Sequence, residues 1–403
     1  YPAEQFPTGT AGWRDGQELR PEDVSFAPFA ADYENLFRLH QQADDDFFYV
    51  GSAYWGMPWM EAILGCPVFA AGANCRAEAC LVAAAAPPRL EIGQDPWFQA
   101  LVRFTEELVE FSAGRFPVCP PLLRGPGDCA SAMLGGMPFV MGFHDEPEQT
   151  ARLLAHCSRT RLAVVRALQA VTPPWHETHA AGGYPSKLWC RRPVAYCQED
   201  SAALLSPDLF RQFLLPLHRE QCGAGDVNFI HLHSSCLYPV DILLENRCYD
   251  VLEINIDHPG GSSPSLPELL PTLKKIQAAR VPLLLWGELT TGEWDTLRRE
   301  LSPVGLSLQP IVRQAEEMRA LREVLRKLCI RPRRACPAGA QVQEEEIPAR
   351  KDLTSDRFAR GKDVPASPRA TTSYLRAFFR RNFGSGGASP PGAFLGIFRP
   401  SRD

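Results

Sequence analysis

Between residues 190 and 328, short apolar runs alternate with longer stretches in which apolar positions recur every three or four residues. The apolar runs have the length of buried strands and cover residues 194–198, 226–230, 251–256, 281–289 and 305–308. The stretches between them have helical spacing and cover residues 206–222, 239–245, 266–279 and 290–301. Regular alternation of strands and helices is typical of βα units around a parallel sheet.

The rest of the first 330 residues adds elements of both kinds. Helical spacing predicts helices at 32–42, 90–114, 147–171 and 307–328, and apolar runs predict strands near 47–56 and 116–123. Residues 1–30 contain many prolines and glycines, and we expect an irregular segment on the surface. A polar, aromatic loop is predicted at 173–193.

These elements predict an α/β protein with one large domain. Several βα units within about 330 residues favour a closed (β/α)₈ TIM-like barrel at 31–330 over an open sheet. Polar residues follow several of the predicted strands. In a parallel α/β protein, ligands bind at the carboxyl ends of the strands, so the pattern predicts the position of a site.

The last part of the chain, 331–403, has a different composition. Pro, Arg and Ser dominate, and the apolar positions keep no sustained period, so we predict a disordered C-terminal tail. The tail holds 14 Lys/Arg against 7 Asp/Glu, a charge of +7, which leaves −12 on residues 1–330. The whole chain carries −5, which argues against a nucleic-acid partner.

Cysteine usage and missing motifs limit the function classes further. The 13 cysteines are odd in number and form no CxxC pair, which favours a reducing, cytoplasmic environment. No apolar run reaches the roughly 18 residues of a transmembrane segment, and nothing near the start resembles a signal peptide. No GxGxxG follows a strand and no P-loop is present, so we expect no nucleotide cofactor.

The densest group of chemically active residues is HLHSSC at 231–236, directly after an apolar run. His231 and His233 are two positions apart, so both imidazoles lie on the same side of the strand. Zinc accepts His, Cys and carboxylate ligands. Cys236 and Glu288 follow predicted strands, and we predict His231, His233, Cys236 and Glu288 as metal ligands. Glu253, Asp257 and His258 are further candidates at strand ends.

The same residues allow other interpretations. Without a metal, His231 or His233 could act with Asp200 as a general acid–base pair, because imidazole titrates near neutral pH. In the simplest alternative, the histidines satisfy loop backbone groups and Cys236 fills the core. Asp200 could equally be a helix-start acid.

Aromatic and acidic residues near the predicted strand ends are candidates for substrate binding. We predict this role for Trp59, Glu61, Tyr54 and Trp175, which could line the mouth or form a flat wall for a macrocycle. The alternative is that the aromatic residues belong to the core and that Glu61 complements a helix N-terminus.

The ordered set MPWMEAILGC, the Gly-Pro turn at 125–127, QEDSAALLSPDLFRQFLLPL, HLHSSC and LLLWGELT resembles the uroporphyrinogen decarboxylase superfamily over about residues 30–328. This superfamily of (β/α)₈ barrels includes uroporphyrinogen decarboxylases and cobalamin-dependent methyltransferases. The resemblance implies an enzyme with a tetrapyrrole or methyl donor as small-molecule substrate, and a corrinoid protein as a possible partner.

This chain departs from the family pattern in two places, and these differences help to decide between decarboxylation and methyl transfer. The decarboxylases carry an Arg-Gln-Ala-Gly-Arg segment after the first strand, where this chain has GSAYWGMPWMEA without Arg. The methyltransferases bind zinc through His-x-Cys, where this chain has His231-x-His233, and through a Cys after the last strand, which is absent here. We therefore favour corrinoid-dependent methyl transfer to a thiol-type acceptor. Uroporphyrinogen-type decarboxylation and a non-catalytic, ligand-binding barrel remain as alternatives.

Overall fold

The computed structural model describes residues 5–42, 48–72, 74–83, 91–182, 188–222, 226–257, 263–311 and 321. They all belong to the first of two compact units, which spans residues 1–328 and 392–403. The predicted tail at 331–403 and most of the helix predicted at 307–328 lie outside the described residues. The prediction of disorder for the tail therefore stays a prediction.

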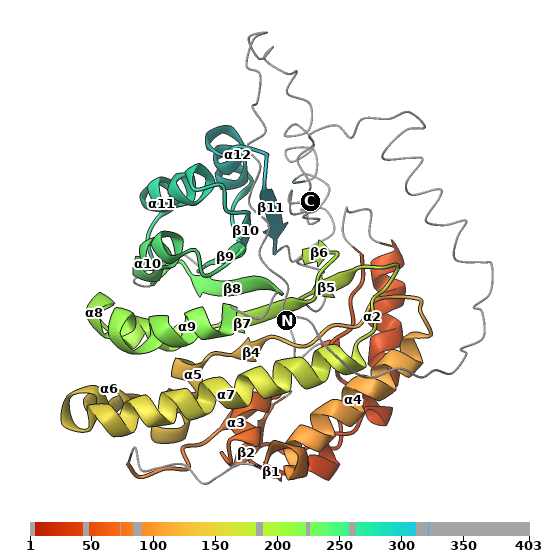
Figure 1. Ribbon diagram of the computed structural model, residues 1–403. Coiled ribbons are helices and arrows are strands. Elements are labelled where there is room, and N and C mark those ends of the chain that lie inside the picture. Colours follow the sequence, from red (N-terminus) through yellow and green to blue (C-terminus); the bar gives the residue numbers. More distant parts are fainter. Residues whose placement is uncertain are drawn as a thin grey trace, which may run out of the picture. The chain divides into compact units, whose positions relative to one another are not determined.

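A six-stranded parallel sheet carries the predicted site, with its strands in the order β11-β10-β9-β8-β7-β4 (Figure 1). The strands are β4 (Leu123–Arg124), β7 (Val194–Gln198), β8 (Val227–His233), β9 (Val251–Ile256), β10 (Leu283–Gly287) and β11 (Leu306–Pro310). Each neighbouring pair is parallel. All six carboxyl ends therefore lie along one edge, as the alternation in the sequence predicts.

The sheet has two different faces, because successive side chains of a strand point to opposite sides. On one of them, the helix face, Ile230, Ile254 and Leu285 pack into the main core. The opposite side, which we call the site face, carries a separate apolar cluster that includes Val194, Tyr196, Val227, Phe229, Val251 and Leu284. Further along the same face, toward the carboxyl ends, the apolar residues give way to polar ones.

Helices lie on the side of the helix face and share its core (Figure 1). They are α4 (Pro96–Ser112), α5 (Pro126–Leu134), α6 (Gly136–Asp145), α7 (Pro147–Val171), α8 (Pro207–Leu209), α9 (Leu215–Gln221), α10 (Tyr238–Asn246), α11 (Leu266–Ala278) and α12 (Thr291–Glu300). The bounds of α7 are those predicted from the sequence. Local signals set several helix starts. Asp95, for example, accepts a hydrogen bond from the Phe98 amide at 2.8 Å before α4.

The N-terminal part contributes more to the core than its sequence indicates. It contains α2 (Ala30–Gln42), α3 (Trp59–Ile63) and an antiparallel sheet of β1 (Glu18–Leu19), β2 (Val68–Ala71) and β3 (Asn74–Ala77). The expectation that residues 1–30 lie on the surface is wrong for Phe6, Phe26 and Phe29, which are buried in the main core. Burial of these large aromatic side chains adds substantially to the apolar area of the core.

Two further predictions differ from the structure. In place of the strand expected at 47–56, the described residues 48–56 make one isolated parallel bridge, Gly51 to Val118. The loop expected at 173–193 contains a hairpin of β5 (His179–Ala181) and β6 (Leu188–Cys190), whose Leu188 and Cys190 join the apolar cluster of the site face. Over the described ranges, the sheet is therefore parallel and TIM-like, but the eight-stranded closure is not seen.

None of the helices in the described ranges is long and apolar enough to cross a membrane.

Candidate metal centre

The two histidines of HLHSSC lie on the site face of β8, at its carboxyl end. Their Nε2 atoms face each other at 3.2 Å, and the rings are nearly perpendicular, at 86°. His231 is buried, whereas the side chain of His233 is 32% exposed. The predicted same-side placement is thus observed, and the open side of the pair is at His233.

The other ring nitrogen of each histidine contacts a carboxylate from β9 or its end. His231 Nδ1 lies 2.8 Å from Glu253 Oε1, and His233 Nδ1 lies 2.6 Å from Asp257 Oδ1. The register explains this arrangement, since His231 of β8 pairs with Glu253 of β9. Carboxylates that hold the distal nitrogen of a histidine are the usual outer partners of metal-binding imidazoles.

Each carboxylate is in turn held in place. The Tyr196 hydroxyl donates to Glu253 Oε2 at 2.9 Å, and the Ser235 amide donates to Asp257 Oδ2 at 3.1 Å. Burial acts to raise the pKa of Asp257, but hydrogen bonds from His233 and Ser235 outweigh it and hold that pKa below its ordinary value. Asp257 is therefore an anion that accepts the Nδ1 proton of His233.

Asp200, just after β7, completes a group of three. Its Oδ1 lies 3.6 Å from His233 Nε2, and Gln198 donates a hydrogen bond to its other oxygen. One ligand atom each from Asp200, His231 and His233 falls within a 4.8 Å cluster, and this trio is the metal-capable group found among the described residues.

The donor set fits a metal ion for a reason of hydrogen bonding. When both Nδ1 atoms donate to carboxylates, both Nε2 atoms present lone pairs to each other at 3.2 Å. A cation between them removes this repulsion. Two imidazoles on a tetrahedral zinc, with bonds of about 2.0–2.1 Å, place their nitrogens roughly 3.3–3.4 Å apart. The observed separation is close to that value.

The remaining predicted ligands stand apart from this trio. Cys236 follows β8 and Glu288 follows β10, and both are half-buried, but neither belongs to the clustered group. Burial raises the pKa of Cys236 to about 11, so its thiol is protonated at neutral pH. His258 lies outside the described residues.

The predicted substrate-binding aromatics lie in different surroundings. Tyr54 is fully buried among Phe6 and Phe29. Trp59, 2% exposed, donates a hydrogen bond to the Tyr54 carbonyl at 2.8 Å. The structure thus places these two in the aromatic core, which is the alternative left open by the sequence.

Trp175 is half-exposed and lies before the β5–β6 hairpin. It stacks on Phe48 and donates a hydrogen bond to the Gly114 carbonyl at 3.0 Å. These contacts do not include the histidine pair. A different tryptophan does: Trp286 on β10 has its ring 5.9 Å from that of His231. Its position on the site face follows from the period of the strand, but its register with β8 cannot be obtained from the sequence alone.

Glu61 belongs to an ion pair at the same edge of the sheet. It is 1% exposed, and its Oε1 lies 2.8 Å from Arg124 Nη1 at the end of β4. Burial raises the pKa of Glu61, against the opposing effect of Arg124. The Arg124 side chain is 48% exposed. In the strand register, Arg124 of β4 is the partner of Gln198 of β7, which lies two positions before Asp200. Arg124 thus brings a positive charge to the edge that holds the metal-capable trio.

Arg124 is not among the residues predicted from the sequence, although it stands between an apolar run and a Gly-rich turn. That turn has a structural role. A Cβ atom at Gly125 or Gly127 would meet the Glu199 carboxylate at 2.3 or 2.4 Å, and Glu199 Oε1 accepts a hydrogen bond from the Asp128 amide at 2.9 Å. Glycine is required here so that the start of α5 can close around a buried carboxylate.

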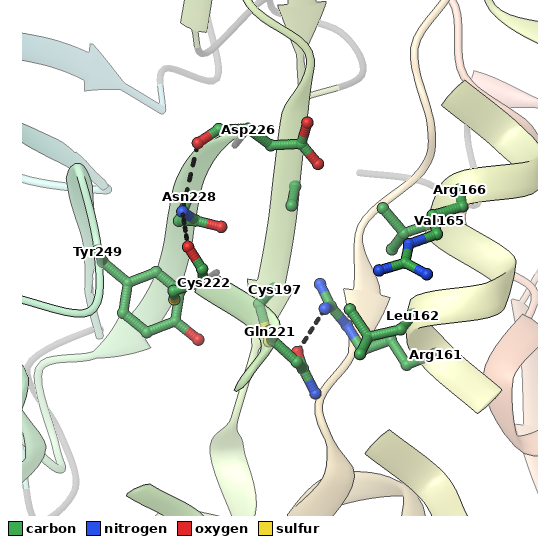
Figure 2. Close-up of a pocket in the computed structure, with 11 residues that line it drawn as sticks. Arg161, Leu162, Val165, Arg166, Cys197, Gln221, Cys222, Asp226, Asn228 and Tyr249 are labelled. Atoms are coloured by element: carbon green, nitrogen blue, oxygen red, sulfur yellow. Dashed lines mark hydrogen bonds between the residues drawn. The ribbon is translucent and has the colours of Figure 1, made fainter. Parts of the chain in front are cut away.

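A small cavity lies on the helix side of β7 and β8, beside α7 and α9 (Figure 2). Cys197 and Asn228 line it from the strands, and Arg161 and Gln221 line it from the helices. Arg161 is buried, and it donates to Gln221 Oε1 at 2.5 Å and to the Tyr196 carbonyl at 2.8 Å. The cavity is thus a packing feature of the helix face, separate from the histidine pair.

No protein-family model matches the chain, and no curated protein matches it in sequence. Among solved structures, a methyltransferase from Methanosarcina mazei aligns with a TM-score of 0.54 and 15% identity, over 81% of this chain and 90% of that chain. A B12-independent methionine synthase from Shewanella sp. W3-18-1 in complex with selenomethionine aligns with a TM-score of 0.40 and 12% identity, over 80% of this chain and 98% of that chain. The second score is too low to carry an argument. The first confirms the predicted resemblance at the level of the fold.

Proposed function

We propose that this protein is a metal-dependent methyltransferase in which His231, His233 and Asp200 hold a zinc ion and a small thiol is the methyl acceptor. The single observation that carries the proposal is the convergence of two Nε2 atoms at 3.2 Å, each on a ring whose Nδ1 is bound to a carboxylate. Three protein ligands and one open position are typical of catalytic zinc. The fold shared with a methyltransferase supports the choice of reaction.

A bound zinc would supply one kind of chemistry here, which is to keep a coordinated thiol as its nucleophilic anion at neutral pH. The residues of the chain do the rest. Glu253 and Asp257 fix the tautomer and orientation of the two imidazoles. The exposed side of His233 leaves access for the acceptor, and the half-buried Trp286 lies beside His231, with the two rings 5.9 Å apart.

The donor set of two histidines and one carboxylate also suits ferrous iron, so the identity of the metal must be measured. The zinc content of the full chain, purified without added metal, should be about one ion per protein molecule, as measured by inductively coupled plasma mass spectrometry. With methylcobalamin as the methyl donor and 2-mercaptoethanesulfonate or homocysteine as the acceptor, the protein should form the methyl thioether. The reaction is measured as the loss of the absorption spectrum of methylcobalamin.

The outcomes separate the three function classes. Zinc with thioether formation supports the proposal. Zinc without transfer to either thiol refutes this acceptor class, and no bound metal refutes the centre itself. Conversion of uroporphyrinogen by metal-free protein would instead favour a decarboxylase in which His233 and Asp200 act as general acid and base. Tight ligand binding without turnover would favour the non-catalytic barrel.

A further inference from the structure

A second reactive group lies at the base of the β2–β3 ribbon. The sulfur atoms of Cys66 and Cys80 are 3.6 Å apart, although the residues are 14 positions apart in the sequence. Cys66 is buried, at 2% exposure, and Cys80 is half-buried. The proposed function uses neither thiol.

Backbone pairing fixes this contact on both sides. The ribbon pairs Val68 with Ala77, and the Glu78 amide donates to the Pro67 carbonyl at 2.9 Å, so both cysteines lie at one end of the ribbon. The Cys66 amide donates to the Glu61 carbonyl at 2.9 Å, and the Cys80 amide donates to the Met133 carbonyl at 3.0 Å. The two sulfur atoms are therefore held in contact by the ordered backbone on either side.

The two thiols differ in a way that suits a stepwise reaction. The hydrogen bond from Cys66 lowers the pKa of Cys80 to about 7, and the same contact, with burial, raises the pKa of Cys66. Cys80 is also the more exposed of the two. A partly ionised, accessible thiol beside a buried partner is the arrangement of an attacking and a resolving cysteine.

We propose that Cys66 and Cys80 form a thiol–disulfide exchange site whose substrate is a low-molecular-weight disulfide. The Cys80 thiolate attacks one sulfur of the small disulfide, forms a mixed disulfide and releases one small thiolate, which takes up a proton. Cys66 then loses its proton and attacks the Cys80 sulfur, which releases the second small thiol. Two protein thiols are oxidised to one disulfide, and one small disulfide is reduced to two thiols. The sulfur atoms need to approach by roughly 1.5 Å to reach the bond length of a disulfide.

The test uses the full chain in buffers that contain glutathione and glutathione disulfide at varied ratios. After acid quenching, free thiols are alkylated, and the protein is cleaved with trypsin. Cleavage after Arg76 separates Cys66 from Cys80, so a bridge between them links the peptides 39–76 and 77–89. Cys75 lies in the same peptide as Cys66, so fragment-ion spectra that place the alkyl group on Cys75 are needed to assign the bridge to Cys66. We expect the linked pair to accumulate as glutathione disulfide increases and to disappear on reduction.

Single variants sharpen the result. Cys66→Ser should stop at the mixed disulfide of Cys80 with glutathione, and Cys80→Ser should give neither product. Cys75→Ser is the matched control, because Cys75 lies on β3 between them, and burial raises its pKa to about 12. This variant should form the bridge normally. In the unmodified chain, iodoacetamide at pH 7 should alkylate Cys80 at least tenfold faster than Cys75.

Two results would overturn the proposal. One is the absence of the linked pair in fully oxidising buffer, with both cysteines recovered as free thiols and the near-ultraviolet circular dichroism unchanged. The other is a bridge from Cys80 to a different cysteine.

Discussion

Two clusters in this protein combine histidine, carboxylate and tyrosine, and they differ in whether the histidine Nε2 atoms can bind a metal ion. In the closed cluster (Glu199, His218 and Tyr249), His218 is fully buried, with Nε2 3.3 Å from Glu199 and Nδ1 2.6 Å from the Tyr249 hydroxyl. Its Nδ1 is hydrogen-bonded to Tyr249, and its Nε2 is enclosed against the Glu199 carboxylate without a well-formed hydrogen bond. In the open cluster (Tyr196, His231, His233, Glu253 and Asp257), each Nδ1 atom contacts a carboxylate within hydrogen-bond distance. The two Nε2 atoms point at each other, with Asp200 3.6 Å from that of His233.

The difference shows that burial and a carboxylate partner do not by themselves mark a site. The carboxylate of the closed cluster also accepts hydrogen bonds from the Asp128 amide and the Ser201 hydroxyl, and it closes the start of α5. Its work is structural. The open cluster has two Nε2 atoms that face each other, a third metal-capable group in Asp200, and access from solvent at His233.

Replacing a histidine of the open cluster with alanine should strongly weaken metal binding. His233→Ala deletes one ligand of three, so zinc affinity should fall by more than the roughly 10–100-fold lost when an outer partner is removed. Competition with a chromophoric zinc chelator measures the affinity. His144→Ala is the matched control, because His144 is exposed at the end of α6 and should have no effect. Unchanged affinity in His233→Ala would exclude this centre.

In the closed cluster, His218→Ala should instead cost stability. It leaves Glu199 and the Tyr249 hydroxyl without their buried partner and creates a cavity, at a cost of about 3–5 kcal/mol in the free energy of unfolding. Urea denaturation measures the loss. Zinc affinity of the folded fraction should stay within about twofold of the parent. A large fall in affinity at full stability would contradict the division between the clusters.

Glu253→Gln tests the outer carboxylate of His231. The amide keeps the size of the side chain but removes the charge that favours metal binding at Nε2, so zinc affinity should fall roughly tenfold. Glu288→Gln is the comparison, because Glu288 is predicted as a ligand from the sequence but lies outside the clustered trio. If Glu288→Gln weakens zinc binding more than Glu253→Gln, the ligand set is different from the one proposed here.

Much of the fold can be predicted from local patterns. The bounds of α7 and β9 follow directly from apolar spacing, and the order of βα units predicts that strand ends meet at one edge. The strand predicted at 47–56 is reduced to a bridge at Gly51, because an apolar run does not by itself supply a pairing partner. The β5–β6 hairpin was not predicted, because short strands give weak periodic signals. Phe6, Phe26 and Phe29 were misplaced because their Pro- and Gly-rich context resembles a surface segment.

The site shows the same division between local and long-range information. The placement of His231 and His233 on one side follows from their spacing along a strand. Which carboxylate meets which imidazole depends on the register of β9 against β8, and no local pattern encodes that register. Arg124 was missed for a related reason, since its partner Glu61 is far away in the sequence and its neighbour Gln198 lies on another strand.

The smallest expected effect comes from removing one hydroxyl in each cluster. Tyr249→Phe leaves His218 Nδ1 buried without its partner, and Tyr196→Phe removes the hydrogen bond to Glu253 Oε2 at 2.9 Å. Each should lower the free energy of unfolding by about 1–2 kcal/mol, because a buried polar group loses one hydrogen bond. Only Tyr196→Phe should also weaken zinc binding, by a few-fold, since it loosens the carboxylate that orients His231. If the two variants lose equal stability but only Tyr196→Phe weakens zinc binding, the removal of one hydroxyl distinguishes the structural histidine, His218, from the metal-site histidine, His231. Equal zinc affinities would mean that Glu253 is positioned without Tyr196.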